Sequence, residues 1–392
     1  MKNIIYLVLF MFTLSGCIEP YNAKTDSIDS ILVVEGIISS GTTRITLSKS
    51  VGLDENLWRH WGGEDQFAVN HAIVYVECED GTRSNPTYSS GGGNYLIETG
   101  ELNVDKRYRL VINLDGEKYQ SSFLAPAISP PIDTILFKVD RNDLINVYVS
   151  TTGFEHQPGY YLWSYKEDWE ITSITEGPWV IIQGETVDND LFSPNNRFYC
   201  WRKDSSRNLI LGSTEKLIEN SIREKSIHSF NRTSERTSEL YRIIVFQNTI
   251  HKEAYDYFYN LEKNIKQIGS IFGPIPSEIM GNIKCESNPN IPVIGYVDVS
   301  TTSSKEGYLD SRYYDYTFKV EQAVQCSLNL DTISTHEERP PVPRNGFVKY
   351  KYIPGPPLGL PKDTVYIAEY CVDCTKNGGS KRKPKNWPND HQ

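Results

Sequence analysis

The chain has 392 residues and carries 40 Lys and Arg against 50 Asp and Glu, a formal net charge of −10 at pH 7. This acidic balance excludes the basic footprint that nucleic-acid binding requires, and it disfavours flat adsorption on an anionic membrane. A chain of this length usually forms two domains, each large enough to bury a core.

The N-terminus has the pattern of a bacterial lipoprotein signal. Lys2 supplies a positive charge, and residues 4–14 form an apolar run that is too short to span a bilayer, which takes about 20 residues. The small residues Ser and Gly directly precede Cys17, where such signals are cut and acylated. We therefore expect residues 1–16 to be removed and Cys17 to carry acyl chains such as palmitate. The alternative is an ordinary signal peptide with a cysteine there by chance.

The composition favours β structure. Aromatic residues make up 12% of the chain, with 25 Tyr, while 21 Pro and 27 Gly supply frequent turns. Chains of this kind with many short apolar runs usually fold as sandwiches or barrels. We therefore predict a mainly all-β protein.

After a polar tether at residues 17–30, residues 31–127 are predicted to form an immunoglobulin-like β-sandwich. Short segments alternate with the period of half-buried strands, and Asp80-Gly81 and Asp115-Gly116 provide turn signals. About six or seven such strands with regular turns are typical of that fold. The predicted strands include 31–36, 43–48, 72–79, 94–97, 108–114 and 118–123.

Pro130 and Pro131 mark a domain boundary. Residues 132–370 are predicted to form a second β-sandwich-like domain. Within it, residues 204–239 are polar throughout and are interpreted as a long loop or mobile insertion. The predicted strands are 134–139, 146–150, 160–165, 179–183, 198–203, 241–247, 294–300, 313–320, 346–352 and 364–370.

One segment of the second domain breaks the strand pattern. Between residues 251 and 268, apolar residues recur at steps of three and four, which predicts an amphipathic helix with Thr249 as N-cap and Gly269 as stop. We expect its apolar stripe to pack on the second sandwich rather than on a partner. The stripe consists of Ala254, Tyr257, Phe258, Leu261, Ile265 and Ile268.

Residues 371–392 form a cysteine-containing basic tail. Apart from Cys17, six cysteines remain, and in an oxidising envelope such cysteines form disulfides. The Cys-x-x-Cys motif at 371–374 precedes a Gly pair near the C-terminus, which favours a structural disulfide over a redox centre or half of a zinc site. The pairing stays open, and we expect Cys200 to bond Cys371 or Cys374. The disulfide candidates are Cys200, Cys285, Cys326, Cys371 and Cys374.

Two segments are candidate contact surfaces. One is a glycine-ended loop in which two Trp side chains bracket an Arg and a His, residue types that are common in binding hot spots. The alternative is that one or both Trp side chains fill the open end of the sandwich. A basic run in the tail either stays solvated or binds an acidic partner or a lipopolysaccharide phosphate. The residues are Trp58, Arg59, His60 and Trp61 in the loop, and Lys381, Arg382 and Lys383 in the tail.

No motif identifies a reaction. The seven histidines are scattered without a His-Glu-x-x-His pair, and His251 is interpreted as a surface histidine. Residues 188–190 (D-N-D) suggest calcium but lack the Gly and Glu of an EF-hand. A glycosidase-type carboxylate pair stays possible because its spacing is a property of three dimensions. We predict no catalytic residue, no metal and no cofactor.

Short segments spread over most of the chain occur together in one known family. They are C-I-E-P at 17–20, V-V-E-G-I-I-S at 33–39, A-I-V-Y-V at 72–76, D-G at 80–81, G-N-Y at 93–95, P-P-I-D at 130–133, H-K-E-A-Y-D-Y-F at 251–258, G-S-I-F at 269–272, G-N-I at 281–283, G-Y-V-D-V-S at 295–300, C-V-D-C-T-K-N-G-G at 371–379 and K-N-W-P at 385–388. In this order and spacing the chain resembles the lipoprotein family named domain of unknown function four-two-four-nine.

The resemblance implies an outer-membrane lipoprotein that faces the cell surface and works with a TonB-dependent receptor. It implies no activity and no catalytic residues. The basic run in the tail departs from the family, whose link between the Gly pair and the Trp is shorter and less basic. Sorting to the surface favours an acidic cluster after the lipidated cysteine, and only Glu19 follows Cys17 closely here.

We therefore expect a non-enzymatic, lipid-anchored module that captures a ligand or caps a TonB-dependent receptor. The alternatives are an envelope hydrolase acting on glycan or peptide, and a structural partner of another envelope complex. Replacing Trp58 and Trp61 by Ala separates the first two, since capture would be lost while turnover would persist.

Overall fold

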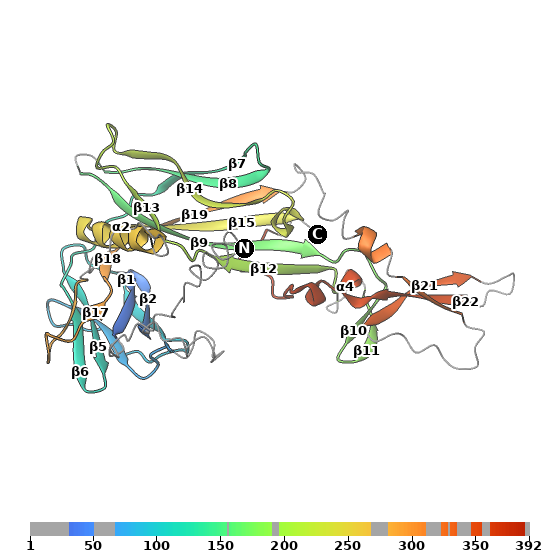
Figure 1. The fold of residues 1–392 in the computed structure, drawn as a ribbon, viewed down its shortest axis with the longest axis horizontal. Coiled ribbons are helices and arrows are strands. Elements are labelled where there is room, and N and C mark those ends of the chain that lie inside the picture. Colours follow the sequence, from blue (N-terminus) through green and yellow to red (C-terminus); the bar gives the residue numbers. More distant parts are fainter. Residues whose placement is uncertain are drawn as a thin grey trace, which may run out of the picture.

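The computed structural model describes residues 31–50, 67–154, 157–189, 196–267, 281–310, 323–327, 330–334, 346–354 and 361–388. These residues are mainly β strands, which confirms the all-β prediction. They form two sandwiches at one end of an elongated molecule and a smaller C-terminal module at the other end (Figure 1). No helix in these ranges is long and apolar enough to cross a membrane.

The first sandwich consists of two sheets around one apolar core, as predicted. One sheet has the order β17-β1-β2-β4, and the other has the order β16-β6-β5-β3. Leu32, Val34 and Ile38 of β1 face the core because successive side chains of a strand point to opposite faces. The strands from the predicted domain are β1 (Leu32–Ser39), β2 (Gly41–Lys49), β3 (Ile73–Cys78), β4 (Asn94–Gly100), β5 (Tyr108–Leu114) and β6 (Glu117–Ser121).

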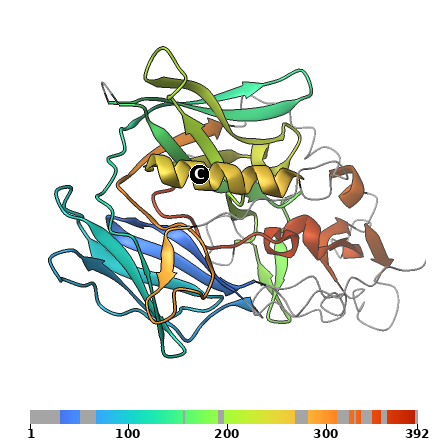
Figure 2. The same ribbon diagram turned by 60° about the vertical axis from the view of Figure 1, so that its left-hand side comes forward.

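Three strands from later in the chain complete the first sandwich: β16 (Ile283–Cys285), β17 (Val293–Ile294) and β18 (Asp298–Ser300). β16 pairs with β6, while β17 and β18 pair in parallel with β1. The orange return segment accordingly lies beside blue β1 in Figures 1 and 2. The prediction that 132–370 is one continuous domain is therefore wrong, because parallel pairing joins strands that no local pattern connects.

Gly295 allows the return segment to approach β1 closely. Its φ of +141° lies in a region that side chains rarely adopt. A Cβ at this position would lie 2.2 Å from the carbonyl oxygen of Val34. Only glycine fits between the two strands.

The second sandwich packs a three-stranded sheet, β14-β8-β7, over a larger sheet with the order β12-β9-β15-β19. β13 pairs with the first part of the long strand β9. Trp163 and Tyr241 are among its largest fully buried side chains. The strands are β7 (Ile132–Val139), β8 (Leu144–Thr152), β9 (Tyr160–Thr172), β12 (Tyr199–Ser205), β13 (Ile210–Ser213), β14 (Ser221–Asn231), β15 (Leu240–Thr249) and β19 (Thr302–Asp310).

The polar stretch 204–239 is not a loop, and that prediction was wrong. It contains β13, β14 and the 3-10 helix η4 (Glu235–Thr237). β14 forms because Ile222, Ile227 and Phe230 are buried in the second core, while the polar residues between them remain more exposed. A strand that has one face in water needs apolar residues only on the face that packs on the core.

The helix α2 (Lys252–Gln267) confirms the predicted amphipathic helix. It crosses the junction between the two sandwiches (Figure 2). His251 rather than Thr249 precedes its first turn, since the His251 carbonyl accepts a hydrogen bond of 3.0 Å from the Tyr255 amide.

The apolar stripe of α2 packs on both sandwiches, not on the second alone as expected. Ala254 and Tyr257 share one buried cluster with Tyr160 of the second sandwich and Tyr296 of the return segment. Ile265, from the same stripe, is exposed. The helix therefore joins the two sandwiches instead of covering only one.

The C-terminal module has its own small core, which includes Val180, Val348 and Ile367. A three-stranded sheet of order β20-β22-β21 packs beside the hairpin β10–β11. Its elements are β10 (Trp179–Ile182), β11 (Glu185–Asp188), β20 (Asp331–Ser334), β21 (Phe347–Pro354), β22 (Pro361–Ala368), α4 (Glu369–Val372) and the 3-10 helix η6 (Cys374–Asn377).

Candidate functional site

Two of the predicted sites lie outside the described residues. These are the lipidation site Cys17 and the aromatic loop with Trp58, Arg59, His60 and Trp61. Their predicted roles stay predictions.

The basic tail packs on its own protein. Backbone hydrogen bonds of 2.8 Å in both directions join Ser380 to Trp201 of β12. The Lys381 ammonium donates to the Tyr199 carbonyl and lies 5.8 Å from the centre of the Trp201 ring, and burial lowers its pKa. Of the three basic residues proposed for contacts, Lys381 therefore serves the fold, Lys383 is half-buried, and Arg382 is exposed.

Trp387 fixes the end of this tail against β15. Its ring is buried in a cluster with Trp201 and lies 5.4 Å from the guanidinium of Arg242. Arg242 also donates to the Lys385 carbonyl at 2.9 Å and pairs with Asp168 at 2.6 Å. The tail is thus an integral part of the second sandwich.

Two disulfides hold the Cys-x-x-Cys motif. Cys374 bonds Cys200 of β12, and Cys371 bonds Cys326 in the C-terminal module. This arrangement agrees with the expectation that Cys200 pairs with one of the two motif cysteines. The motif therefore ties the second sandwich to the C-terminal module.

Cys285 is not in a disulfide, contrary to its place among the candidates. It is buried as a free thiol on β16, and Cys78 is a second buried free cysteine. The Cys285 sulfur lies 3.5 Å from a carboxylate oxygen of Glu117 and 3.5 Å from the hydroxyl of Ser287. Both free thiols belong to the first sandwich.

His251 is a bridge between the sandwiches rather than a simple surface histidine. Its Nδ1 lies 2.6 Å from Oδ1 of Asp298, and its backbone amide donates to Oδ2 at 2.8 Å. Asp298 belongs to β18 and is fully buried, while the His251 ring stays partly exposed. The hydrogen bond to Asp298 raises the pKa of His251, against the lowering effect of burial. A carboxylate of one sandwich thus caps a helix attached to the other.

Several segments that carry the family resemblance meet at this junction. His251 and Tyr257 come from 251–258, and their partners Asp298 and Tyr296 come from 295–300. The rings of Tyr257 and Tyr296 lie 5.6 Å apart. Spacing along the sequence gave no signal for this contact, because the two segments belong to separate elements.

A second cluster of charges is buried inside the second sandwich. Glu167 of β9 accepts hydrogen bonds from Arg236, the shortest being 2.5 Å, and from the Tyr241 hydroxyl at 2.7 Å. Burial raises the pKa of Glu167, but His228 and Arg236 outweigh burial and lower it to about 2. His228 Nε2 lies 3.3 Å from Glu167 without the alignment of a hydrogen bond, so Arg236 is the better-placed partner. The guanidinium also lies 4.4 Å from the Trp169 ring.

Tyr165, His228 and Glu167 lie side by side as a hydroxyl, an imidazole and a carboxylate, the groups that a hydrolase uses, although only the first two are hydrogen-bonded to each other. The Tyr165 oxygen lies 2.8 Å from His228 Nδ1. Burial raises the pKa of Tyr165 to about 12, while that of Glu167 is about 2, so at neutral pH the hydroxyl is protonated and the carboxylate is charged. The Glu167 carboxylate is almost fully buried and is neutralised by Arg236, which fits a structural role in the second sandwich.

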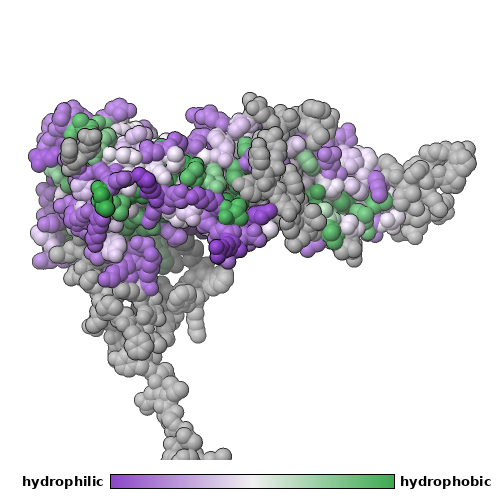
Figure 3. Space-filling view, turned by 90° about the horizontal axis from the view of Figure 1, so that it is seen from above, coloured by the Kyte–Doolittle hydropathy of each residue, from purple (hydrophilic) through white to green (hydrophobic). Residues whose placement is uncertain are grey.

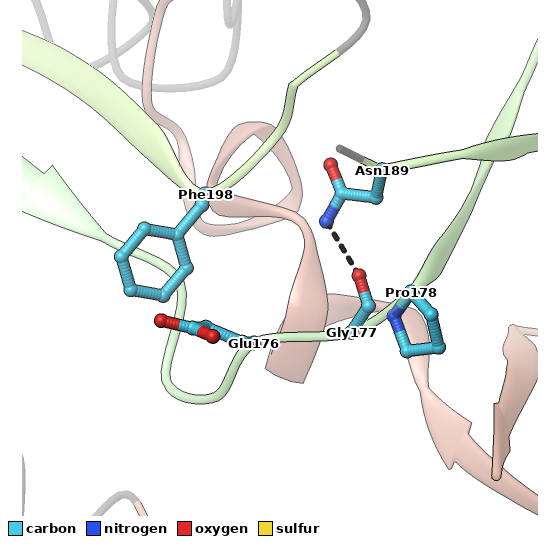
Figure 4. Close-up of a pocket in the computed structure, with 5 residues that line it drawn as sticks. All are labelled: Glu176, Gly177, Pro178, Asn189 and Phe198. Atoms are coloured by element: carbon cyan, nitrogen blue, oxygen red, sulfur yellow. Dashed lines mark hydrogen bonds between the residues drawn. The ribbon is translucent and has the colours of Figure 1, made fainter. Parts of the chain in front are cut away.

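A pocket of about 290 Å³ lies where β9 connects to β10. Figure 4 shows the Glu176 carboxylate beside the Phe198 ring and the Asn189 amide donating to the Gly177 carbonyl at 2.9 Å. Asn189 Oδ1 accepts from the Arg197 amide at 2.7 Å, so the middle of the three side chains suggested for calcium is bonded inside the protein. Pro178 completes the lining. The volume is at the lower limit of ligand pockets, about 300 Å³.

In the described part of the chain, no three His, Cys, Asp or Glu side chains are grouped so that they would hold a metal ion. The described residues therefore offer three features: the junction bridged by His251 and Asp298, the buried ion pair of Glu167 and Arg236, and the tail linked to β12 by the disulfide of Cys374.

Comparison with known proteins gives a family but no activity. Curated protein sequences include no match to the chain. Among solved structures, a two-domain fibronectin type III segment of chicken tenascin is 9% identical, and the match covers 72% of this chain and 99% of the segment. Its TM-score of 0.16 is too low to support an argument. The model of the family described as "Domain of unknown function (DUF4249)" matches residues 18–306, and the chain belongs to this family.

Proposed function

We propose that the protein is an outer-membrane lipoprotein that captures a ligand for, or caps, a TonB-dependent receptor at the cell surface, without catalysis of its own. The observation that carries the proposal is the apolar run 4–14, which ends in Leu14 and is followed directly by Ser15, Gly16 and Cys17. Two or more acyl chains on Cys17 would hold the protein stably on a membrane. The receptor as partner rests on the resemblance to the family.

The tether sets how far the body extends from the membrane. Residues 18–30 lie between Cys17 and the first described residue, Ile31. At about 3.5 Å per residue, a fully extended tether of this length reaches about 45 Å. Confinement within this distance of the membrane raises the effective concentration of the protein at a receptor in the same membrane.

The rigid junction supports a binding role. Ser129 lies just before the domain boundary, and its hydroxyl accepts a hydrogen bond from the Thr249 amide at 2.7 Å. The Ser129 amide donates to the Thr301 hydroxyl at 2.8 Å. Together with the bridge between His251 and Asp298, these bonds join both sandwiches and α2 into one body. A preorganised body loses little conformational entropy when it binds, which favours affinity.

The test compares the native protein with a form that lacks the anchor. The C-terminally tagged full chain is expressed in its own host, beside a Cys17→Ser variant behind a signal peptide that ordinary signal peptidase cuts. Membranes are extracted in mild detergent and separated on native gels. We expect the native chain to carry the mass of acyl chains and to migrate with a TonB-dependent receptor, while the variant is soluble and alone. A native chain that is acylated but migrates without a receptor would contradict the receptor part of the proposal.

A further inference from the structure

The two disulfides are nested along the chain. Cys200 bonds Cys374 across a sequence separation of 174 residues, and the bond between Cys326 and Cys371, with a separation of 45, lies inside the loop that the first bond closes. Two further cysteines, one before this loop and one within it, stay buried thiols. Pairing of the six described cysteines in the order of the sequence would therefore give neither native bond.

The Cys-x-x-Cys motif competes with both native bonds. Its two cysteines have different partners in the fold, although they are separated by only two residues. Contact between two points of an unfolded chain becomes rarer with loop length, so the native pair with separation 45 meets about eightfold more often than the pair with separation 174. Cysteines in a Cys-x-x-Cys motif readily bond each other, as they do in redox centres. One bond within the motif would take a cysteine from each native disulfide.

The folded tail selects the partner of Cys374. Backbone hydrogen bonds of 2.8 Å join Ser380 to Trp201 of β12 in both directions. A Cβ at Gly379 would lie 2.5 Å from the Cβ of Cys200, so the tail passes over the disulfide with no room for a side chain. The contact brings together the two ends of a long loop beside α4 (Figure 1). The native bond is therefore favoured only after β12 and the tail have met.

The cysteines are inaccessible in the folded protein. The six described cysteines are at most 5% exposed. Seen from above, the described surface is mainly hydrophilic with small apolar areas, as expected of a body whose cores are closed to water (Figure 3). Thiol–disulfide exchange requires a thiolate to reach a disulfide sulfur. A wrong bond must therefore be exchanged before the cores close.

We propose that the chain reaches its native disulfides through a thiol–disulfide isomerase, an enzyme that presents a nucleophilic thiolate. This inference rests on the proposed function only for the export of the chain to an oxidising compartment, where a disulfide oxidant first joins cysteines that are close in sequence. The isomerase then exchanges these bonds while the sandwiches are still open. Its substrate is the unfolded chain with a bond inside the Cys-x-x-Cys motif.

The exchange conserves the number of disulfides. The starting chain holds the bonds Cys371–Cys374 and Cys285–Cys326, each between cysteines closer in sequence than either native pair. The isomerase thiolate attacks the Cys374 sulfur, which forms a mixed disulfide and releases the Cys371 thiolate. This thiolate attacks the Cys326 sulfur, which forms the Cys326–Cys371 bond and releases the Cys285 thiolate. The Cys200 thiolate then attacks the Cys374 sulfur, which forms the second native bond and frees the enzyme. In sum, one proton passes from Cys200 to Cys285, and no oxidant is consumed.

The test refolds the chain from residue 17 onward, with Cys17→Ser, after reduction and unfolding in urea. Refolding takes place in one buffer of glutathione and glutathione disulfide, with and without purified protein disulfide isomerase. Samples are alkylated, and the bonds are mapped by mass spectrometry of peptides. We expect the Cys371–Cys374 bond to dominate early samples, and the isomerase to accelerate formation of Cys200–Cys374 by at least about tenfold.

Two variants locate the competition. The Cys78→Ala/Cys285→Ala/Cys326→Ala/Cys371→Ala variant leaves only one possible bond, which should form at the same rate with and without isomerase. The Cys78→Ala/Cys285→Ala variant keeps the motif and should still depend on the enzyme. Equal rates for the parent chain with and without isomerase would overturn the proposal, and so would equal acceleration of both variants. Neither result bears on receptor binding, so the proposed function would stand.

Discussion

The two sandwiches are stabilised by different means. The first relies on an apolar core closed by the return strands, and its buried Cys78 and Cys285 remain free thiols. The second contains the buried Glu167–Arg236 pair and is cross-linked to the tail by the Cys200–Cys374 disulfide. Both sandwiches bury paired carboxylates, since Glu77 and Asp298 of the first are paired with Arg109 and His251. Among the described residues, only the second sandwich is also held by a disulfide.

A single substitution has a different effect on stability at an apolar core position and at a buried charge. Apolar cores tolerate many substitutions of similar volume. A buried charge, by contrast, becomes unfavourable as soon as its partner is removed. We expect both sandwiches to be sensitive to the loss of one partner of a buried ion pair, the second also to the loss of its disulfide, and the first also to substitutions at points of close backbone approach.

Removal of the tail disulfide should have the largest effect. The Cys200–Cys374 bond closes a sequence separation of 174 residues, against 45 for Cys326–Cys371. Chain entropy alone gives upper values of about 5 and about 4 kcal/mol, respectively. We expect Cys200→Ala/Cys374→Ala to lower the free energy of unfolding more than Cys326→Ala/Cys371→Ala, as measured by urea denaturation. An equal or smaller loss in the first pair would show that the tail is not essential to the second sandwich.

Glu167→Ala should cost about 3 to 5 kcal/mol, because it leaves Arg236 buried without a counter-charge. The double variant Glu167→Leu/Arg236→Met removes both charges and should recover part of this loss. The folded pKa of Glu167 is about 2 against a reference of 4.5, so its contribution is present above pH 4.5 and is lost as pH falls toward 2. Acid titration of native protein should show this loss, and Glu167→Ala should not. An identical acid transition in the variant would refute the assignment.

Gly295→Ala tests the first sandwich at its point of closest approach. The new Cβ would meet the Val34 carbonyl, and the positive φ adds backbone strain, for a total of about 2 kcal/mol or more. Gly100→Ala is the matched control, since Gly100 also has a positive φ, +63°, but no atom lies within 4 Å of a Cβ there. Thermal unfolding should separate the two variants. Equal losses of stability in the two variants would mean that backbone strain alone, and not the close approach of the return segment, excludes a side chain at Gly295.

The bridge between His251 and Asp298 should have the smallest effect, about 1 kcal/mol. Because the folded pKa of His251 is raised from 6.5, its contribution is complete below pH 6.5 and is lost as pH rises through the raised value. We expect the free energy of unfolding to decrease over this range in native protein, and His251→Gln to remove that decrease. A variant with the native pH dependence would assign it to another group.

Local patterns predicted much of the fold. The alternating segments 108–114 and 241–247 became β5 and β15, and the spacing of apolar residues predicted α2. Contacts between remote segments were not predictable, since no period in the sequence links β18 to β1 or His251 to Asp298. The cysteine pattern predicted a bond from Cys200 to Cys371 or Cys374, and the fold selects Cys374.

We propose that this chain is a lipid-anchored partner of a TonB-dependent receptor. The most direct measurement is the mass of the intact assembly isolated from native membranes through a C-terminal tag. We expect an assembly of one acylated chain with one receptor. An acylated chain that is found alone, or with an unrelated envelope complex, would contradict it.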